Sequence, residues 1–304
     1  PLCGKIIHES PRVVNQAKAW YNRPMRNAAI VTDSTAGLPA ELVQELGIHV
    51  VPIPLIQDGQ TFLDGVDITP TEVYRRLRAG EIGFSTSAPS VPEFLRVYEA
   101  AAQGALGVLS IHMSPELSHT HDVALAASKQ VEAAPPIVLN CNPAAIGQGC
   151  VALEAARAAA AGATLEEVAR RAEEIAAKIQ FLFTLDTFEY LRESGRMGGA
   201  VALLGNMLQI RPVLCMPRGT VEVFARPRTN PRAIEVILQQ MAEEPQDRPM
   251  HAGIAHADVQ EEAEELRRRV AERFDCAELV LTEFTPVVGA HTGPGLIGIA
   301  FYTE

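Results

Sequence analysis

Between Ala28 and Cys141, short apolar runs alternate with segments whose apolar residues recur at helical spacing. The runs AAIVTD, HVVPIPLI, ALGVLSIH and PPIVLNC are typical of strands, and the segments PAELVQELG, TPTEVYRRLRAG, VPEFLRVYEAAAQG and SHTHDVALAASKQVEA are typical of helices. Such alternation indicates βαβ units, whose crossover helices return the chain so that the strands run parallel. We therefore expect the first half to be a three-layer α/β/α domain with a mainly parallel sheet.

The second half has a different pattern. An Ala-rich helix is predicted over residues 143–162 and a further helix from Thr164 to about Lys178, in which Thr164 and Glu167 form a capping box. Beyond Lys178, strand-like runs follow at short spacing: IQFLFTLD, RPVLCMP, TVEVFAR, HAGIAHA, ELVLTEF and LIGIAFYT. We expect an α/β domain with a mixed sheet and with helices on one side of it.

These patterns divide the 304 residues into an N-terminal arm (1–26), an N-terminal α/β domain (27–178) and a C-terminal α/β domain (179–304). Each domain is long enough to bury a core of its own. A pair of domains also leaves a cleft, which is a common place for a ligand pocket.

The charge balance limits the possible partners. The chain has 26 Lys and Arg against 37 Asp and Glu, a formal net charge of -11. Negative charge of this size repels phosphate backbones and anionic membrane surfaces. Aromatic residues make up only 5% of the chain, which leaves few side chains for stacking on bases. We therefore expect no nucleic-acid partner.

The cysteines and the apolar runs indicate the compartment. Five widely spaced cysteines without a CxxC pair argue against a disulfide framework and against a thiolate zinc site. No apolar stretch approaches the length that crosses a bilayer, and the opening PLCGKIIHESPRVVNQ lacks the apolar core of a signal peptide. We expect a cytoplasmic protein without an integral membrane segment.

Three polar runs lie at the ends of predicted strands, where open α/β sheets bind ligands. In the first run, residues 85–90, Ser90 is placed to cap the helix that follows. Thr86 and Ser87 lie too far upstream for that role. Their hydroxyl groups are therefore candidates to donate hydrogen bonds to an anion.

The second run, residues 110–122, contains residue types that are found in metal sites: His112, His119, His121 and Asp122. The spacing of His119 and His121 would point them to different faces of a helix, so we expect no metal. Ser118 precedes the predicted helix and is a candidate helix cap or anion donor.

The third run, AHTGPGLIGIAF, matches GxGxxG at Gly293, Gly295 and Gly298. A dinucleotide fingerprint follows the first strand of a βαβ unit and opens a helix, whereas the segment after Gly298 is typical of a strand. We expect no nucleotide cofactor here, but a Gly-Pro-Gly turn with His291 at its mouth.

A set of motifs extends from about Ile30 to Phe301. They are IVTDSTAGLP at Ile30, VVPIPL at Val50, DGVDITPTEVY at Asp64, TSAPSVPEF at Thr86, SIHMSPELS at Ser110, LRESGRMGG at Leu191, the RT pair at Arg228, and AHTGPGLIG at Ala290. In this order they resemble the DegV family, whose better understood members are the fatty-acid-binding subunits of bacterial fatty acid kinase.

The resemblance implies two α/β domains and a long-chain fatty acid held in a tunnel, with no cofactor and no catalytic residue in this chain. By position it implies that Thr86, Ser87, Ser118 and His291 bind the carboxylate. A carboxylate that leaves water needs several hydrogen bonds, which hydroxyl groups and an imidazole supply. Burial of the tail contributes about 0.8 kcal/mol per methylene.

The resemblance also implies a partner, an ATP-dependent kinase subunit that phosphorylates the bound carboxylate to an acyl phosphate. Arg196 and Arg228 match positions suited to docking that subunit or contacting the phosphoryl group, because the arginine fork matches phosphate. The alternative for both is a solvated arginine in a surface salt bridge.

Two alternative functions remain open at this point. One is a small lipid-ester hydrolase that uses Ser118 or Ser87 with His291, although the chain contains no GxSxG motif. The other is a lipid store or sensor of the same fold that never meets a kinase.

Overall fold

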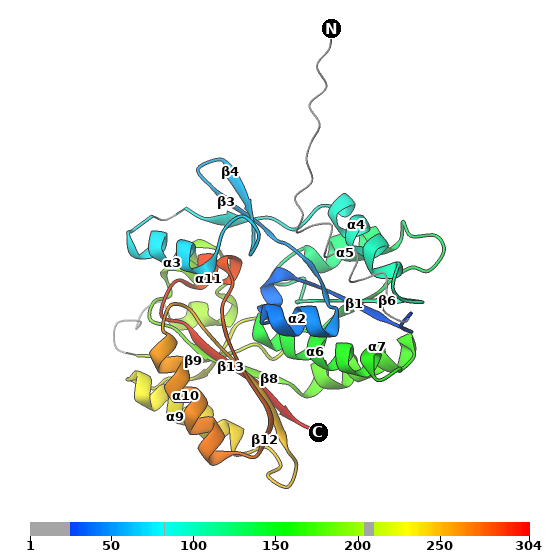
Figure 1. The fold of residues 1–304 in the computed structure, drawn as a ribbon. Coiled ribbons are helices and arrows are strands. Elements are labelled where there is room, and N and C mark those ends of the chain that lie inside the picture. The colour runs from blue at the N-terminus through cyan, green and yellow to red at the C-terminus, as the bar shows by residue number, and fades with distance from the viewer. Residues whose placement is uncertain (1–24, 82, 204–209) are drawn as a thin grey trace.

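The computed structural model describes residues 25–81, 83–203 and 210–304. The N-terminal half is built on a four-stranded parallel sheet (Figure 1). From edge to edge its strands are β2 (His49–Val51), β1 (Ala29–Asp33), β6 (Val108–His112) and β7 (Ile137–Asn140). All three pairings are parallel, which confirms the prediction for this half. The predicted arm lies outside the described residues, except for residues 25 and 26.

Helices cover both faces of this sheet. They are α4 (Val91–Ala102) and α5 (Thr120–Ser128) on one face, and α6 (Ile146–Ala160) and α7 (Leu165–Lys178) on the other. Alternate residues of β1 face the two layers, because successive strand side chains point to opposite sides: Val31 joins the core under α4, and Ile30 the core under α6. The expected capping box of Thr164 and Glu167 begins α7. The short elements η1 (Ser34–Ala36) and α2 (Ala40–Leu46) follow β1.

A small antiparallel sheet interrupts this pattern. Its strands are β4 (Gln60–Leu63), β3 (Pro54–Gln57) and β5 (Ser85–Thr86), and α3 (Pro70–Arg78) lies between β4 and β5 in the chain. The prediction of one strand over HVVPIPLI is wrong, since this run divides between β2 and β3, which belong to different sheets. Pro52 lies at the division, where a residue without an N–H group cannot continue a sheet ladder.

The C-terminal half contains a six-stranded sheet. Its order is β10 (Glu222–Ala225), β9 (Val213–Cys215), β8 (Gln180–Thr184), β13 (Ile297–Thr303), β11 (Met250–His256) and β12 (Cys276–Glu283). Only β11 and β12 pair in parallel. The prediction of a mixed sheet is therefore confirmed.

The two faces of this sheet have different covers. The helices α9 (Asn230–Met241) and α10 (Gln260–Arg273) pack on one face, where Ile299 and Phe301 of β13 join their core. The other face contacts α6, and Ala300 and Tyr302 join the core around that helix. The helices α9 and α10 of the second half thus lie on one side of the sheet, as expected, and a helix from the first half covers the other side.

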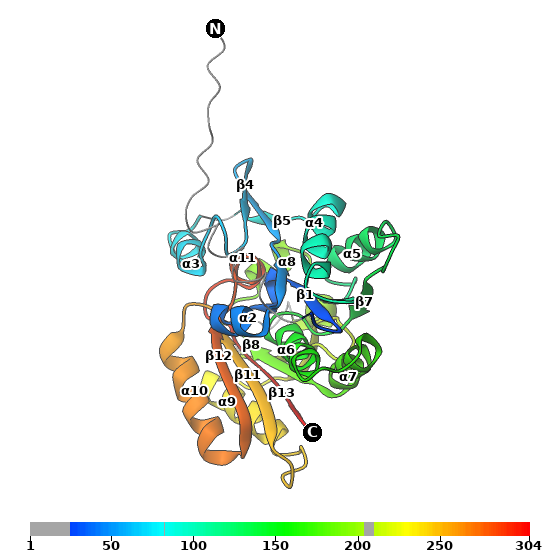
Figure 2. The same ribbon diagram turned by 45° about the vertical axis from the view of Figure 1, so that its right-hand side comes forward.

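Helix α6 lies between the two large sheets (Figures 1 and 2). Its glycine and alanine residues permit this close packing: a Cβ on Gly149 would lie 2.5 Å from the Ala36 carbonyl oxygen. The core around α6 contains side chains from both halves. A boundary near Lys178 therefore remains a prediction.

Three short helical elements complete the region between the halves: α8 (Glu189–Glu193), η2 (Gly198–Leu203) and α11 (Pro286–Thr292). Helix α11 was not predicted. It begins with Pro286, whose fixed φ suits the first helical turn, and it packs against α3 and α8. His291 accordingly lies in the last turn of a helix, directly before the predicted Gly293-Pro294-Gly295 turn.

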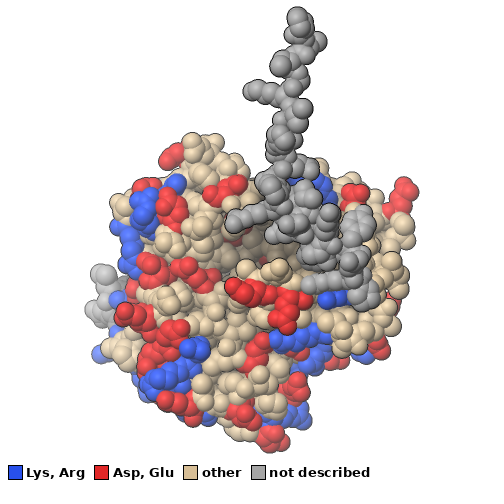
Figure 3. All heavy atoms as spheres, viewed as in Figure 1, with Lys and Arg blue, Asp and Glu red and all other residues tan. Residues whose placement is uncertain are grey.

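Among the residues that the structure describes, no helix is both long and apolar enough to cross a membrane. On the face shown in Figure 3, acidic and basic side chains are interspersed and form no continuous basic stripe. This distribution gives a phosphate backbone no electrostatic track on that face.

Candidate functional site

A pocket lies between the two halves of the molecule. It contains about 780 Å³ of space not filled by atoms, a volume that includes open solvent at its mouth. Its walls are mostly apolar and come from both halves: Ile53, Met113, Leu117, Phe181, Phe183, Leu191, Met216, Val221, Phe284, Val287, Val288 and Leu296. The pocket therefore suits a ligand with a large apolar part.

The polar residues of the lining are Thr35, Thr86, Ser118, Arg196, His291 and Thr292. Two of them already donate their hydroxyl groups within the protein, Thr35 to Asp33 and Thr292 to the Val288 carbonyl oxygen. The other polar residues in this lining are Thr86, Ser118, Arg196 and His291, and all were singled out from the sequence.

Thr86 and His291 form a pair across the two halves. The Thr86 Oγ1 and His291 Nε2 atoms are 2.9 Å apart. The other ring nitrogen, Nδ1, is buried and has no hydrogen-bond partner among the described residues. Burial, and secondly the charge of Arg196, lower the pKa of His291 to about 4, so the ring is neutral at neutral pH. If Thr86 donates a hydrogen bond to Nε2, the ring proton is on Nδ1, which can then donate a hydrogen bond to a ligand.

Strand geometry separates Thr86 from Ser87. Thr86 pairs with Leu55 in the small sheet and lines the pocket. Ser87 is exposed and outside the pocket lining, and its N–H donates to the Pro54 carbonyl oxygen. Successive residues of an extended chain point to opposite sides, so Thr86 faces inward and Ser87 outward. Of the two residues singled out from the sequence, the structure thus places Thr86 in the pocket lining and Ser87 outside it.

Ser118 precedes helix α5 and lines the pocket. Its Oγ lies 2.8 Å from Thr120 Oγ1 and accepts a hydrogen bond from the Thr120 N–H at 3.3 Å. The N-cap position belongs to His119, whose side chain makes no capping bond. When Thr120 donates its hydroxyl proton, the Ser118 hydroxyl is available to donate to a ligand.

The two arginines differ in position. Arg196 is half-buried after Gly195, which has a positive φ of 72°. It lines the pocket, donates to the Leu117 and Ser194 carbonyl oxygens, and is within salt-bridge distance of no acidic group among the described residues. Arg228 is exposed between β10 and α9 and is not part of the pocket lining. The structure therefore brings only Arg196 to His291.

A second hollow adjoins the polar end of the pocket. It shares Thr86, Arg196 and His291 with the pocket and is also lined by Ser85 and Glu193, which are exposed. The polar end thus faces the surface, and the apolar walls lie behind it.

A family model described as uncharacterised proteins of the DegV family matches residues 27–304. The chain belongs to the DegV family. It is 36% identical over 276 residues to a DegV domain-containing protein of Streptomyces coelicolor, covering 90% of this chain and 98% of that protein.

Solved structures agree with this membership. A DegV family protein from Thermus thermophilus, described as binding fatty acid, is 34% identical with a TM-score of 0.86, covering 92% of this chain and 100% of that one. DegV from Bacillus subtilis, described as a fatty acid binding protein, is 28% identical with a TM-score of 0.83 over the same shares of the two chains.

The histidines of the second polar run do not meet in this DegV family member. His112 is buried, and its Nδ1 lies 2.7 Å from Asp33 Oδ2 and its Nε2 2.7 Å from Ser110 Oγ. The side chain of His119 is 85% exposed, and His121 lies near Asp122. The three rings therefore form no common metal site.

Hydrogen bonds link Ser110 to His112 and His112 to Asp33, which is the arrangement of a catalytic triad. Sequence reasoning missed this group. Ser110 is 0% exposed, and its oxygen also accepts a hydrogen bond from the Tyr98 hydroxyl at 3.0 Å. A nucleophile must reach its substrate, so this arrangement serves packing of the core. No signal in the sequence separates it from an exposed triad.

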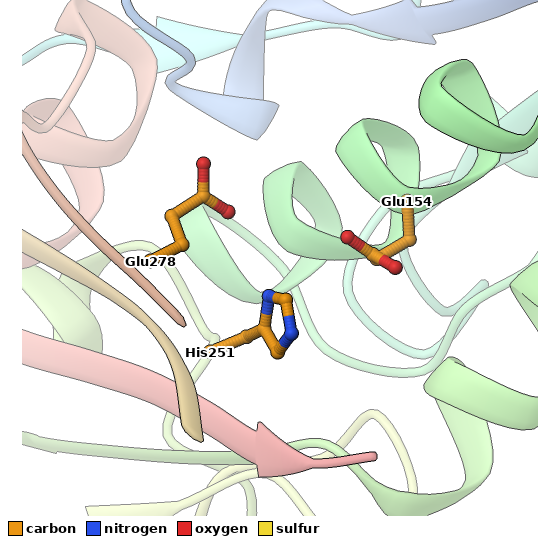
Figure 4. A group of neighbouring side chains, drawn as sticks. All are labelled: Glu154, His251 and Glu278. Atoms are coloured by element: carbon orange, nitrogen blue, oxygen red, sulfur yellow. The ribbon is translucent and has the colours of Figure 1, made fainter. Parts of the chain in front are cut away.

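A second group that the sequence did not suggest lies between α6 and the C-terminal sheet. Figure 4 shows Glu154, His251 and Glu278 converging, with one ligand atom of each within 4.8 Å of the others. Arg157 already binds both carboxylates, and Arg171 binds Glu154 at 3.1 Å. A cation would have to displace these arginines, so the group fits an ion-pair network better than a metal site.

Proposed function

We propose that this chain is a cytoplasmic carrier that binds one long-chain fatty acid and presents it to a separate ATP-dependent kinase subunit, which forms the acyl phosphate. One observation carries the proposal: an apolar pocket has its available polar groups, Thr86, Ser118, Arg196 and His291, in the same lining, and three of these also line the hollow at its mouth. A fatty acid has the same division into an anionic end and an apolar tail.

The polar end suits a carboxylate. The hydroxyl groups of Thr86 and Ser118 and the Nδ1 of His291 are neutral donors, and Arg196 adds a positive charge beside them. Hydrogen bonds to an ionised acceptor are stronger than those between neutral groups. The apolar walls then contribute about 0.8 kcal/mol for each methylene that they remove from water.

The similarity to DegV proteins of Thermus thermophilus and Bacillus subtilis that are described as fatty-acid-binding supports the same ligand class here. The kinase step is supported by the shared hollow, through which a second protein can approach the carboxylate beside Arg196. The exposed Arg228 is our candidate for a docking contact with that protein.

Native mass spectrometry of the purified protein, followed by solvent extraction, tests the ligand. We expect one long-chain acid per chain. A protein that is empty and also fails to bind added palmitate or oleate would overturn the ligand proposal.

The kinase role needs a separate test. Incubation of the loaded protein with ATP and a fatty acid kinase subunit from a DegV-containing bacterium should yield an acyl phosphate, trapped as its hydroxamate. Binding of acid without acyl phosphate formation with any such subunit would favour a store or sensor instead.

A fluorophosphonate probe tests the hydrolase alternative. Neither Ser87 nor Ser118 is the hydrogen-bond partner of His291, because Thr86 occupies Nε2. We therefore expect no labelling of either serine, whereas stoichiometric labelling would show an activated nucleophile.

A further inference from the structure

The pocket extends along strand β8, away from His291. Strand β8 is antiparallel to β13, so that Thr184 pairs with Ile297 at the start of β13, and Phe181 pairs with Ala300. Helix α11 ends shortly before β13 begins. Phe181 therefore lies farther from the His291 end than Phe183 does, by two residues of strand, or about 7 Å.

Phe181 and Phe183 both line the pocket, and their rings stack with centroids 5.2 Å apart. No residue of β8 before Phe181 and no residue of β13 is part of the lining. Among the described residues of the C-terminal sheet, Phe181 is therefore the lining residue farthest from the His291 end.

Close contacts hold this ring in place. Phe181 is 7% exposed. A Cβ on Gly298 of β13 would lie 2.8 Å from Phe181 Cε2, and a Cβ on Gly147 of α6 would lie 3.5 Å from Phe181 Cβ. Glycine at these positions lets the neighbouring backbones approach the ring, so the ring has little room to swing aside.

Beyond Phe181 the same face of the sheet becomes polar. Tyr302, two residues past the partner of Phe181, stacks on His251 at 5.0 Å. Figure 4 shows Glu154 and Glu278 beside His251. Arg157 donates to both carboxylates. A methyl end that entered this cluster would separate the buried Glu154 and the partly buried Glu278 from their arginine partners, which is costly.

We propose that Phe181 sets the upper limit on the length of the acyl chain, with the charged cluster behind it as a second limit. This inference rests on the proposed function. Removal of the ring opens a space in line with the tail, and that space ends at Tyr302 and His251. A larger ring at the same position shortens the pocket.

The experiment compares Phe181→Ala with a matched control, Leu182→Ala. Leu182 is the next residue of β8 and is 2% exposed, but it belongs to the core under α9 and α10, on the opposite face. Both changes remove buried apolar volume from one strand, and only the first enlarges the pocket. Dissociation constants are measured for saturated acids of twelve to twenty-two carbons.

Each buried methylene strengthens binding about fourfold. We expect the optimum of the Phe181→Ala protein to move to longer acids, with two added carbons gaining about fifteenfold relative to the wild type. The Leu182→Ala protein should keep the wild-type order of chain lengths, and Phe181→Trp should move the optimum to shorter acids.

Three outcomes would overturn the inference. The first is that Phe181→Ala weakens the binding of all acids equally, and the second is that Leu182→Ala shifts the preferred chain length in the same way. The third is that Phe181→Trp leaves the affinity for the longest acid unchanged. Since the two Phe181 variants change the pocket in opposite directions, a folding failure of one leaves the other as the test. Failure of the proposed function is distinct, because the wild type would then bind no acid of any length.

Discussion

Two histidines in this molecule each contact a hydroxyl group, but they differ in whether both ring nitrogens have a partner in the protein. At the first, His112 contacts Asp33 and Ser110, and each member of the group is bonded to another protein atom. At the second, His291 contacts Thr86 through one nitrogen and leaves the other buried and without a partner. The first site is sealed in the core, whereas the second lines a pocket.

The comparison shows why resemblance to a triad is a poor guide to function here. A buried polar group without a partner costs free energy, and the protein avoids this cost around His112 but not at His291. The unpaired Nδ1 of His291 is therefore better explained by a ligand than by packing. The predictions below test this difference in order of decreasing effect.

The largest effect is expected for His112→Ala. The change removes the partner of a buried carboxylate, Asp33, and leaves a hole beside Ser110. We expect a loss of about 3 to 5 kcal/mol in the free energy of unfolding, measured by urea denaturation. His119→Ala, at a side chain that is 85% exposed, is the control. A loss at His112 no larger than at His119 would contradict a structural role.

The His291→Ala change should weaken fatty acid binding by about 1 to 3 kcal/mol, the cost of an unpaired buried acceptor, with a smaller loss of stability than His112→Ala. Isothermal titration with palmitate measures the affinity, and methyl palmitate, which lacks the anionic oxygen, serves as the second ligand. The loss should be smaller for the ester. Unchanged palmitate affinity would remove His291 from the site.

A matched pair of neighbours tests the direction of side chains in β5. Thr86→Val removes the hydroxyl that faces the pocket and should weaken palmitate binding by about 1 kcal/mol. Ser87→Ala alters an exposed position and should change affinity by less than about 0.5 kcal/mol. Equal losses at both positions, in the same titration, would show that Ser87 contacts the ligand after all.

The smallest effect concerns pH. Burial lowers the pKa of His291 to about 4, below its value of about 6.5 in the unfolded chain. Between these values the unfolded chain binds more protons, so stability falls as the pH falls. For this group we expect a loss of about 0.7 kcal/mol between pH 7 and pH 6.

Denaturation curves of the ligand-free protein at the two pH values measure this loss, with His291→Gln as the control that lacks the titrating group. A His291→Gln protein with the same loss as the wild type would show that His291 does not titrate in this way.

Much of the fold follows from local patterns in the chain. The apolar runs and helical periods from Ala28 onward predict most strands of the two large sheets, because hydrophobic periodicity is a property of residues close together in the chain. The capping box at Thr164 is likewise local. The motifs around Thr86, Ser118 and His291 are short segments whose residues could be singled out before their positions in space were known.

Other features depend on contacts between distant segments. Strand β5 has only two residues and exists through its pairing with β3, so the sequence could not show that Thr86 faces inward and Ser87 outward. Helix α6 has apolar residues on all sides because two sheets cover it. Helix α11, which carries His291, is a short segment held by packing against α3 and α8.

The sequence by itself determined the two α/β sheets, the family and most of the polar groups of the pocket, because these depend on residue types at short spacing. Only the tertiary structure decided which hydroxyl groups face the pocket, which histidine is sealed in the core, and that Phe181 lies in the pocket wall. Those properties depend on which side chains from distant segments meet, and such meetings are set by the packing of the whole chain.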